Sequence, residues 1–285
     1  MPVPFEPAVD SPRQLSEAYR LLAEGAPRPI AGGTDLMVQI TGELGEPPER
    51  VLDIWHLDEL RGIRVEGDAL VLGALTTYTD IRRSPLVAEF LPSLGEAAAT
   101  IGAAQIQNRG TLGGNVANAS PAGDTLPILL ATSAQIVLGS TRGERTVAAD
   151  DFWTAYRKTA RADDELVLRL RIPLVPDREV RFRKVGTRRA QAISKVVMAL
   201  AWRPGEGQWA DVRLALGSIA ATPVRAPRAE AVLEGAAPDR ATADRAAEAL
   251  ADEIHPIDDV RSTAEYRKQV SANLLAKFWA DTANG

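Results

Sequence analysis

Apolar residues recur at both strand-like and helix-like spacings along the first 175 residues of this 285-residue chain. Residues 69–75, 134–140 and 165–174 are short runs rich in Leu, Val and Ile, which predicts three strands. Residues 86–101 are rich in alanine and predict one helix. Strands and helices mixed in this way predict an α+β unit.

The pattern changes near Pro176, where runs with a period of two begin. Residues 178–186 and 212–220 predict strands, and residues 195–202 fit either a buried strand or a short helix. Two helical stretches close the chain. We therefore expect an α+β unit of residues 1–175, with subdomains of about 1–55 and 56–175, and a smaller sheet-plus-helices domain of residues 176–285.

Charge and composition exclude several classes of protein. The net charge is −5, from 33 Lys and Arg against 38 Asp and Glu, whereas a general nucleic-acid binder normally carries a basic excess. The chain has no cysteine, so it supplies no disulfide, no iron–sulfur ligand and no thiol nucleophile. Its two histidines, His56 and His255, are far apart in sequence and do not suggest a zinc site.

The N-terminal stretch MPVPFEPAVDSPRQ lacks the basic region and apolar region of a secretory signal. No uninterrupted apolar run approaches the roughly 18 residues of a membrane span. We expect a soluble, cytoplasmic protein.

The stretch AGGTDLMVQI, residues 31–40, places two glycines before a helix-capping residue. Gly32 and Gly33 let a ligand approach the backbone closely. Thr34 or Asp35 then predicts the N-cap of a short helix, whose free N–H groups would face the turn. Such a stretch is either an ordinary turn with a cap or a cradle for phosphate, and its own residues leave both interpretations open.

A second stretch, QIQNRGTLGGNVANASPAGDTLPILLA, spans residues 105–131 and is both polar and rich in glycine. It leads into an apolar run at residues 126–131 that predicts a buried helix. The backbone N–H groups of such a loop need partners, which are either water or the oxygens of a diphosphate. A solvated connection is the alternative interpretation.

Residues 205–210, GEGQWA, fit a dinucleotide-binding pattern only nominally. That pattern requires a strand before it and a helix after it, whereas here Pro204 precedes and a predicted strand follows. We interpret the stretch as a hairpin turn. The chain also contains no P-loop motif.

Three stretches together, AGGTDL, QNRGTLGGNVANASPAGD and FRKVGTRRAQAIS, resemble the signatures of a known family. That family comprises the FAD-binding medium subunits of molybdenum hydroxylases, the group of xanthine dehydrogenase, carbon monoxide dehydrogenase and aldehyde oxidoreductase. The closing stretch IDDVRSTAEYRKQV is similar as well, so the resemblance covers nearly the whole chain. It implies a two-subdomain FAD-binding fold of the PCMH and vanillyl-alcohol-oxidase type, followed by the smaller C-terminal domain.

The resemblance implies that the two glycine stretches together hold the FAD diphosphate. The residues that it assigns to this site are Ile30, Ala31, Gly32, Gly33, Thr34, Asp35 and Leu36 from the first stretch, and Thr111, Gly113, Gly114 and Asn115 from the second. Asp124 matches a family carboxylate that binds a ribose hydroxyl. The alternative role for Asp124 is to cap the helix that follows it.

The resemblance also assigns residues to the flavin ring. Lys184 matches a family lysine beside the isoalloxazine, where a fixed cation would stabilise the anionic reduced flavin. The alternative is a solvated lysine on a strand. Ile101, Val167 and Ile193 match apolar contacts of the ring, although each also fits a core position, and Arg188 and Arg189 fit contacts with a partner.

In the family, hydroxylation occurs on a molybdopterin-containing large subunit, and a small subunit carries 2Fe–2S clusters. The flavin receives electrons from the clusters and passes them to NAD⁺ or oxygen. The resemblance therefore implies an electron-transfer subunit of a heterotrimer that is doubled into a hexamer. It implies no catalytic residue and no metal ligand on this chain.

Two other hypotheses remain from the residues. One is a stand-alone FAD-dependent oxidase or dehydrogenase that acts on its own small substrate, with Tyr78, Tyr156 or His56 as acid or base. The other is a binding module for a nucleotide sugar or polyphosphate that uses the same glycine turns without redox chemistry.

Overall fold

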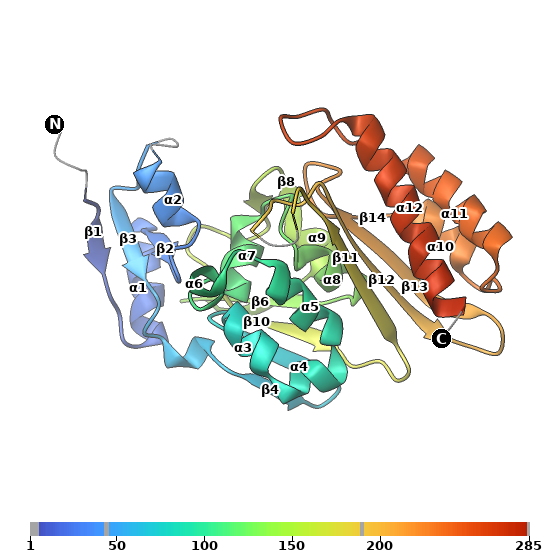
Figure 1. The fold of residues 1–285 in the computed structure, drawn as a ribbon. Helices are drawn as coiled ribbons and strands as arrows, with labels where there is room; N and C mark the ends of the chain where they lie inside the picture. Colours follow the sequence, from blue (N-terminus) through green and yellow to red (C-terminus); the bar gives the residue numbers. More distant parts are fainter. Residues whose placement is uncertain (1–5, 43–45, 189–190, 284–285) are drawn as a thin grey trace.

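The first of three main sheets lies at one end of the molecule and contains three parallel strands in the order β1-β3-β2 (Figure 1). The computed structural model describes residues 6–42, 46–188 and 191–283. Buried leucines of helix α1 and strand β3, including Leu22 and Leu52, form the core of this unit. Its elements are β1 (Ala8–Asp10), α1 (Leu15–Gly25), β2 (Arg28–Ile30), α2 (Leu36–Thr41) and β3 (Arg50–Asp53).

The second sheet is antiparallel, with five strands in the order β4-β5-β10-β6-β7. Short helices pack on it and bury most of their apolar side chains in one large core. The strands are β4 (Ile63–Glu66), β5 (Ala69–Gly73), β6 (Gln135–Ser140), β7 (Gly143–Ala148) and β10 (Leu166–Pro173), and a separate pair is β8 (Trp153–Ala155) and β9 (Lys158–Thr159). The helices are η1 (Asp58–Leu60), α3 (Tyr78–Arg83), α4 (Pro85–Phe90), α5 (Pro92–Thr100), α6 (Ala104–Gln107), α7 (Leu112–Asn118), α8 (Leu126–Ala131) and α9 (Ala149–Phe152).

The third sheet is antiparallel in the order β11-β12-β13-β14, and three helices cover the face that is turned away from the second sheet (Figure 1). Strand β12 is buried on both faces. Val197 and Ala199 pack with the second sheet's core, whereas Met198 and Leu200 pack under the C-terminal helices. The elements are β11 (Glu179–Val185), β12 (Val196–Pro204), β13 (Trp209–Gly217), β14 (Val224–Arg225), α10 (Pro227–Leu233), α11 (Arg240–Glu253) and α12 (Ala264–Ala283).

The α+β fold class is confirmed, and three local predictions can be judged. The single helix predicted for residues 86–101 is wrong, because the chain breaks at Leu91 into α4 and α5. Pro92 causes the break, since it lacks the N–H that a continuous helix needs and restricts the residue before it. The open choice for residues 195–202 is settled as strand β12, and residues 205–210 form the predicted hairpin turn, closed by Gly205 N–H donating to Gln208 O (2.8 Å).

The fold brings two helix starts together at one place. Strand β2 ends at Ile30 and leads through a glycine turn into α2, while Thr111 pairs with Thr77 as an isolated bridge just before α7. In proteins with parallel sheets, ligands commonly bind beyond the carboxyl ends of the strands. The glycine turn lies at the carboxyl end of β2. Among the described residues, no helix is both long and apolar enough to cross a membrane.

Candidate cofactor-binding site

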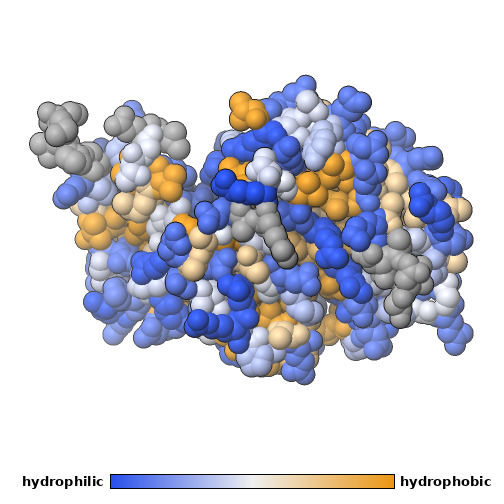
Figure 2. All heavy atoms as spheres, in the orientation of Figure 1, coloured by the Kyte–Doolittle hydropathy of each residue, from blue (hydrophilic) through white to orange (hydrophobic). Residues whose placement is uncertain are grey.

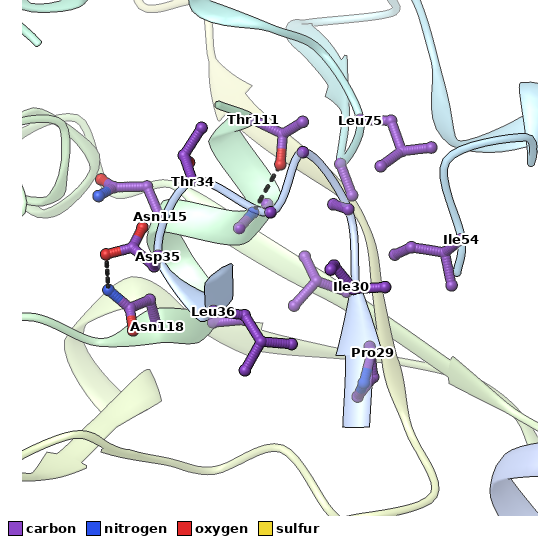
Figure 3. A pocket seen from close by; sticks show the side chains of 18 of the residues that line it. Pro29, Ile30, Thr34, Asp35, Leu36, Ile54, Leu75, Thr111, Asn115 and Asn118 are labelled. Atoms are coloured by element: carbon purple, nitrogen blue, oxygen red, sulfur yellow. Dashed lines mark hydrogen bonds between the residues drawn. The ribbon is translucent and has the colours of Figure 1, made fainter. Parts of the chain in front are cut away.

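A cavity of about 140 Å³, open to solvent, lies between the first sheet and the second. Figure 3 shows apolar Ile30, Ile54 and Leu75 gathered on one side, with Asp35, Asn115 and Asn118 on the other. Of the residues predicted for the site, Ile30, Ala31, Gly32, Gly33, Thr34, Asp35, Leu36, Thr111, Gly113, Gly114, Asn115 and Val167 line this cavity.

The turn between β2 and α2 has little room for a side chain at Gly32. A Cβ on Gly32 would lie 1.7 Å from the carbonyl oxygen of Arg109, far inside van der Waals contact. Gly33 has a φ of +74°, in the left-handed region that favours glycine. The two glycines are therefore required by the close approach of residue 109 and by the turn itself.

Five consecutive backbone N–H groups, from Gly32 to Leu36, have no hydrogen-bond acceptor within the described residues. Asp35 is the N-cap residue of α2, but its side chain does not cap the helix. Instead, Asp35 Oδ1 accepts from Asn118 Nδ2 (3.0 Å), and this contact ties the turn to the end of α7 (Figure 3). A run of unused N–H groups at a cavity is suited to bind the oxygens of an anion.

The second glycine stretch differs from the loop that we predicted, because most of it is helical. The early N–H groups of helix α7 already have acceptors: Gly113 donates to Ala74 O (2.9 Å), just after β5, and Gly114 donates to Thr111 Oγ1 (3.1 Å). Asn115 N–H donates to Thr111 O (3.0 Å). An anion nest of free N–H groups in this stretch is therefore wrong, and so is the alternative of an idle solvated connection, since α7 forms a wall of the cavity.

The polar side chains of α7 remain suited to a ligand. Thr111 Oγ1 accepts from Gly114, which leaves its hydroxyl hydrogen to donate elsewhere. Asn115 Oδ1 accepts from Thr125 Oγ1 (2.6 Å), which fixes the amide and leaves its NH₂ group as a donor. Thr111 and Asn115 thus face the cavity as fixed donors opposite the glycine turn.

Asp124 and Lys184 form a buried ion pair that joins the second and third sheets. Lys184 Nζ donates to Asp124 Oδ2 (2.6 Å) and to Thr100 O (3.2 Å), and each of the two charged side chains is only 8% exposed. Burial raises the pKa of the Asp124 carboxyl, while Lys184 opposes this rise. The alternatives of a helix cap for Asp124 and a solvated lysine for Lys184 are wrong, since α8 has no side-chain cap and Lys184 is buried.

One oxygen of this pair has no partner. Asp124 Oδ1 is buried and has no donor within hydrogen-bond distance among the described residues. The Ser194 hydroxyl lies close enough to lower the pKa of this carboxyl, but it is hydrogen-bonded to Ser218 Oγ (2.8 Å). A buried carboxylate oxygen without a donor costs free energy, which a bound hydroxyl group would recover. Asp124 does not line the cavity beside the glycine turn, so this oxygen marks a second place where a ligand would touch the chain.

The remaining predicted residues lie apart from the cavity. Ile101 is half-buried against the main core, and Ile193 is 53% exposed. Their contact with a flavin ring stays a prediction. Arg188 donates to Gln191 O, and Arg189 lies outside the described residues.

Three residues considered as an acid or base do not come together. Tyr78 lines the cavity, but burial, helped by the carboxylates of Asp35 and Asp124, raises the pKa of its hydroxyl well above the usual range. Tyr78 therefore stays protonated and is not a general base. Tyr156 is 61% exposed, His56 is also exposed, and neither lines the cavity.

Sequence reasoning missed Arg161, which also lines the cavity. Its Nη1 donates to Ala162 O (2.8 Å) and Glu165 O (2.7 Å), and burial lowers its pKa. An isolated arginine in a stretch between strands carries no sequence signal of this position. Among the described residues, no group of three or more His, Cys, Asp or Glu side chains is arranged to hold a metal ion.

Comparisons with known proteins identify the family of this chain. Residues 5–175 match the family described as FAD binding domain in molybdopterin dehydrogenase, and residues 181–282 match the CO dehydrogenase flavoprotein C-terminal domain. The chain is 32% identical to the carbon monoxide dehydrogenase medium chain of Hydrogenophaga pseudoflava, over 94% of this chain and 93% of the relative. It is 33% identical to the nicotinate dehydrogenase FAD-subunit of Eubacterium barkeri, over 95% of this chain and 94% of the relative.

Solved structures share the fold. A chain of the carbon monoxide dehydrogenase from Hydrogenophaga pseudoflava, which lacks the Mo-pyranopterin moiety of the molybdenum cofactor, superimposes with a TM-score of 0.92 at 31% identity and covers 96% of both chains. A chain of quinoline 2-oxidoreductase from Pseudomonas putida 86 gives a TM-score of 0.92 at 27% identity, over 98% of both chains.

Proposed function

Because this chain belongs to the family of FAD-binding subunits of molybdopterin dehydrogenases, we propose that it is the electron-transfer subunit of a molybdenum hydroxylase complex. Its cofactor is FAD, and its relatives are oxidoreductase flavoprotein subunits. In the proposed role, the chain takes electrons from 2Fe–2S clusters on a partner and delivers them to NAD⁺ or another acceptor. FAD supplies the redox chemistry, since it exchanges electrons singly or in pairs.

The observation that carries this proposal is the run of unused N–H groups from Gly32 to Leu36 at the cavity. The diphosphate of FAD is an anion of the kind that such groups bind. Thr111 and Asn115 would donate to it from the facing wall, and the absent side chain at Gly32 keeps the turn close to residue 109. The residues present therefore fit the cofactor.

Asp124 and Lys184 would contact one and the same part of the cofactor, because their charged groups are 2.6 Å apart. The resemblance matches Asp124 to a carboxylate on a ribose hydroxyl. Because its partner Lys184 is matched to the flavin ring, we propose instead that the free Asp124 Oδ1 binds a hydroxyl of the sugar-alcohol chain that adjoins this ring. Lys184 would place its charge near that ring, held in position by Asp124 and Thr100. The pair would thus orient the flavin. It would influence the flavin's redox potential as a pair of opposite charges and not as a single positive charge.

The partner follows from what this chain lacks. The sequence contains no cysteine, so the chain supplies no thiolate for an iron–sulfur cluster. Tyr78, Tyr156 and His56 do not form a site that would activate a substrate, which leaves the stand-alone flavoenzyme without support from the geometry. Substrate hydroxylation is assigned to a molybdopterin-containing large subunit.

The test is the reduction of the flavin by defined donors. The purified, FAD-loaded chain is mixed in a stopped-flow instrument with the reduced 2Fe–2S subunit of its complex, and separately with NADH, while flavin absorbance is followed. The proposal predicts rapid bleaching by the iron–sulfur subunit. Direct bleaching by a small organic substrate, with none by the iron–sulfur subunit, would refute it and support the stand-alone enzyme.

A further inference from the structure

The indole ring of Trp55 lies against two guanidinium groups. The central guanidinium carbon, Cζ, lies 3.8 Å from the ring centre in Arg109 and 4.6 Å from it in Arg61. The face of a tryptophan ring attracts a cation at this distance, more strongly where water is partly excluded, and Trp55 is half-buried. None of these three residues lines the cavity beside the glycine turn.

Trp55 and Arg109 belong to different parts of the fold. Trp55 follows β3 of the first sheet, whereas Arg109 lies between α6 and α7, which pack with the second sheet. Figure 2 shows the first-sheet unit as a lobe on the left, set off from the rest of the molecule by an indentation of the upper edge. An apolar core also joins the two parts, since Leu52 of β3 packs in one cluster with Leu166 and Leu168 of β10. The Trp55–Arg109 contact adds to this core and is not part of it.

Residue 109 contacts the ends of two neighbouring strands. Strands β2 and β3 are paired, and beyond their last residues Ile54 N–H donates to Ile30 O (3.0 Å). The carbonyl oxygen of Arg109 occupies the space beside Gly32, just after β2, and its guanidinium stacks on Trp55, just after β3. The backbone and the side chain of one residue therefore both touch the first-sheet unit.

The Trp55 residue is fixed by its own hydrogen bonds. Trp55 N–H donates to Asp53 Oδ1 (2.9 Å), and Trp55 O accepts from Arg61 Nη2 (2.5 Å). Arg61 Nη1 also donates to Leu75 O (3.5 Å), and Leu75 lines the cavity. Arg109 thus stacks on a ring whose backbone is already held in place, which lowers the entropy lost in making the contact.

Arg109 is also close to the second wall of the cavity. It stands two residues before Thr111, the N-cap residue of α7, and Asn115 lies one turn further along that helix. A shift of residue 109 away from Trp55 would therefore move these two donors relative to the glycine turn. Donors on two walls bind one anion together only while the walls keep their spacing.

We propose that the Trp55–Arg109 contact is a clasp that sets the spacing between the glycine turn and α7, and through it the affinity for FAD. This inference rests on the proposed function, because that function places the FAD diphosphate between these two walls. Trp55 and Arg109 are positioning residues: they touch no part of the cofactor and act through Gly32 and Thr111.

The test is a double-mutant cycle on the affinity for FAD, measured by titrating the FAD-free chain and following flavin fluorescence. Trp55→Leu removes the ring, Arg109→Met removes the cation, and the double variant removes both. We expect each single variant to raise the Kd of FAD roughly fivefold, and the double variant to raise it no further than the larger single effect, because one shared contact is lost only once. Trp55→Phe keeps an aromatic ring and should bind FAD within about twofold of the wild type.

Two features of the chain keep this test specific. Tyr266→Leu is the matched control, because it removes the ring of another cation–π pair, in which Lys195 Nζ lies 4.8 Å from the ring centre, and Tyr266 does not line the cavity. This control should leave the Kd of FAD unchanged. Arg109 is exposed, so Arg109→Met removes no core contact and tests the clasp even where Trp55→Leu fails to fold.

Three results would overturn the inference while the wild type still binds FAD. One is a wild-type Kd in both single variants. Another is a double variant in which the two effects multiply, since the two residues would then act independently. The third is a Trp55→Phe chain that binds FAD as weakly as Trp55→Leu does. A wild-type chain that binds no FAD would instead refute the proposed function, and the clasp with it.

Discussion

Removing one partner of the Asp124–Lys184 pair is expected to destabilise the protein strongly. At 2.6 Å and an effective dielectric constant of about 20, the attraction between the two charges is about 6 kcal/mol before the cost of taking them out of water. Lys184→Met leaves the Asp124 carboxylate buried without a cation. Breaking a buried pair in this way typically costs about 3–5 kcal/mol in the free energy of unfolding.

The assay is urea unfolding of the FAD-free chain at pH 7, with Lys158→Met as the control. Lys158 is exposed on β9, so the same substitution there should change the unfolding free energy by less than about 0.5 kcal/mol. The double variant Asp124→Asn with Lys184→Met should recover part of the loss, because no charge is left buried. A loss below about 1 kcal/mol for Lys184→Met would refute the assignment of a buried, energetically coupled pair.

Two further predictions concern pH and the start of α7. Burial raises the pKa of Asp124, and Lys184 opposes this rise. In Lys184→Met this opposition is lost, so the pKa of Asp124 in the folded state rises further above its unfolded value, and the stability of the variant falls as pH rises through that window. Urea unfolding should show that the difference in unfolding free energy between wild type and Lys184→Met shrinks from pH 7 to pH 5, by up to about 1.4 kcal/mol per pH unit. A difference that does not change with pH would contradict this prediction. Thr111→Val removes the oxygen that accepts Gly114 N–H, so it should lower the unfolding free energy by about 1 kcal/mol and weaken FAD binding. Thr111→Ser keeps the hydroxyl and should preserve both stability and FAD affinity. Equal FAD affinities of the two variants in a fluorescence titration would contradict the role of the hydroxyl.

Local chemistry in the sequence was enough to predict the glycine turn. Gly32 and Gly33 stand directly before the start of α2, and the structure places the unused N–H groups at this turn. The second glycine stretch was less predictable. Its N–H groups are used by Ala74 and Thr111, and the first of these partners comes from a distant part of the chain.

Other features depended on contacts between remote residues. Asp124 and Lys184 are 60 positions apart, and only the packing of the third sheet on the second brings them together. The pattern of β12 was ambiguous because both of its faces are buried, which removes the alternation that identifies a strand. The break at Pro92 could have been predicted from the sequence, since proline rarely continues a helix. The alanine-rich pattern on either side of Pro92 led us to predict one helix instead.

The role of the glycine turn in FAD binding can be tested by the affinity of FAD for Gly32→Ala, determined by titration of the FAD-free chain and followed by flavin fluorescence. The new Cβ would meet the carbonyl oxygen of Arg109 at 1.7 Å, so the turn must move away from residue 109, which lies just before α7, and the two walls of the cavity must separate. Gly95→Ala is the control, because its Cβ would meet nothing nearer than 3.9 Å. We expect Gly32→Ala to weaken FAD binding by roughly tenfold or more, while Gly95→Ala binds FAD as the wild type does. A folded Gly32→Ala chain with wild-type affinity for FAD would contradict a diphosphate site at this turn.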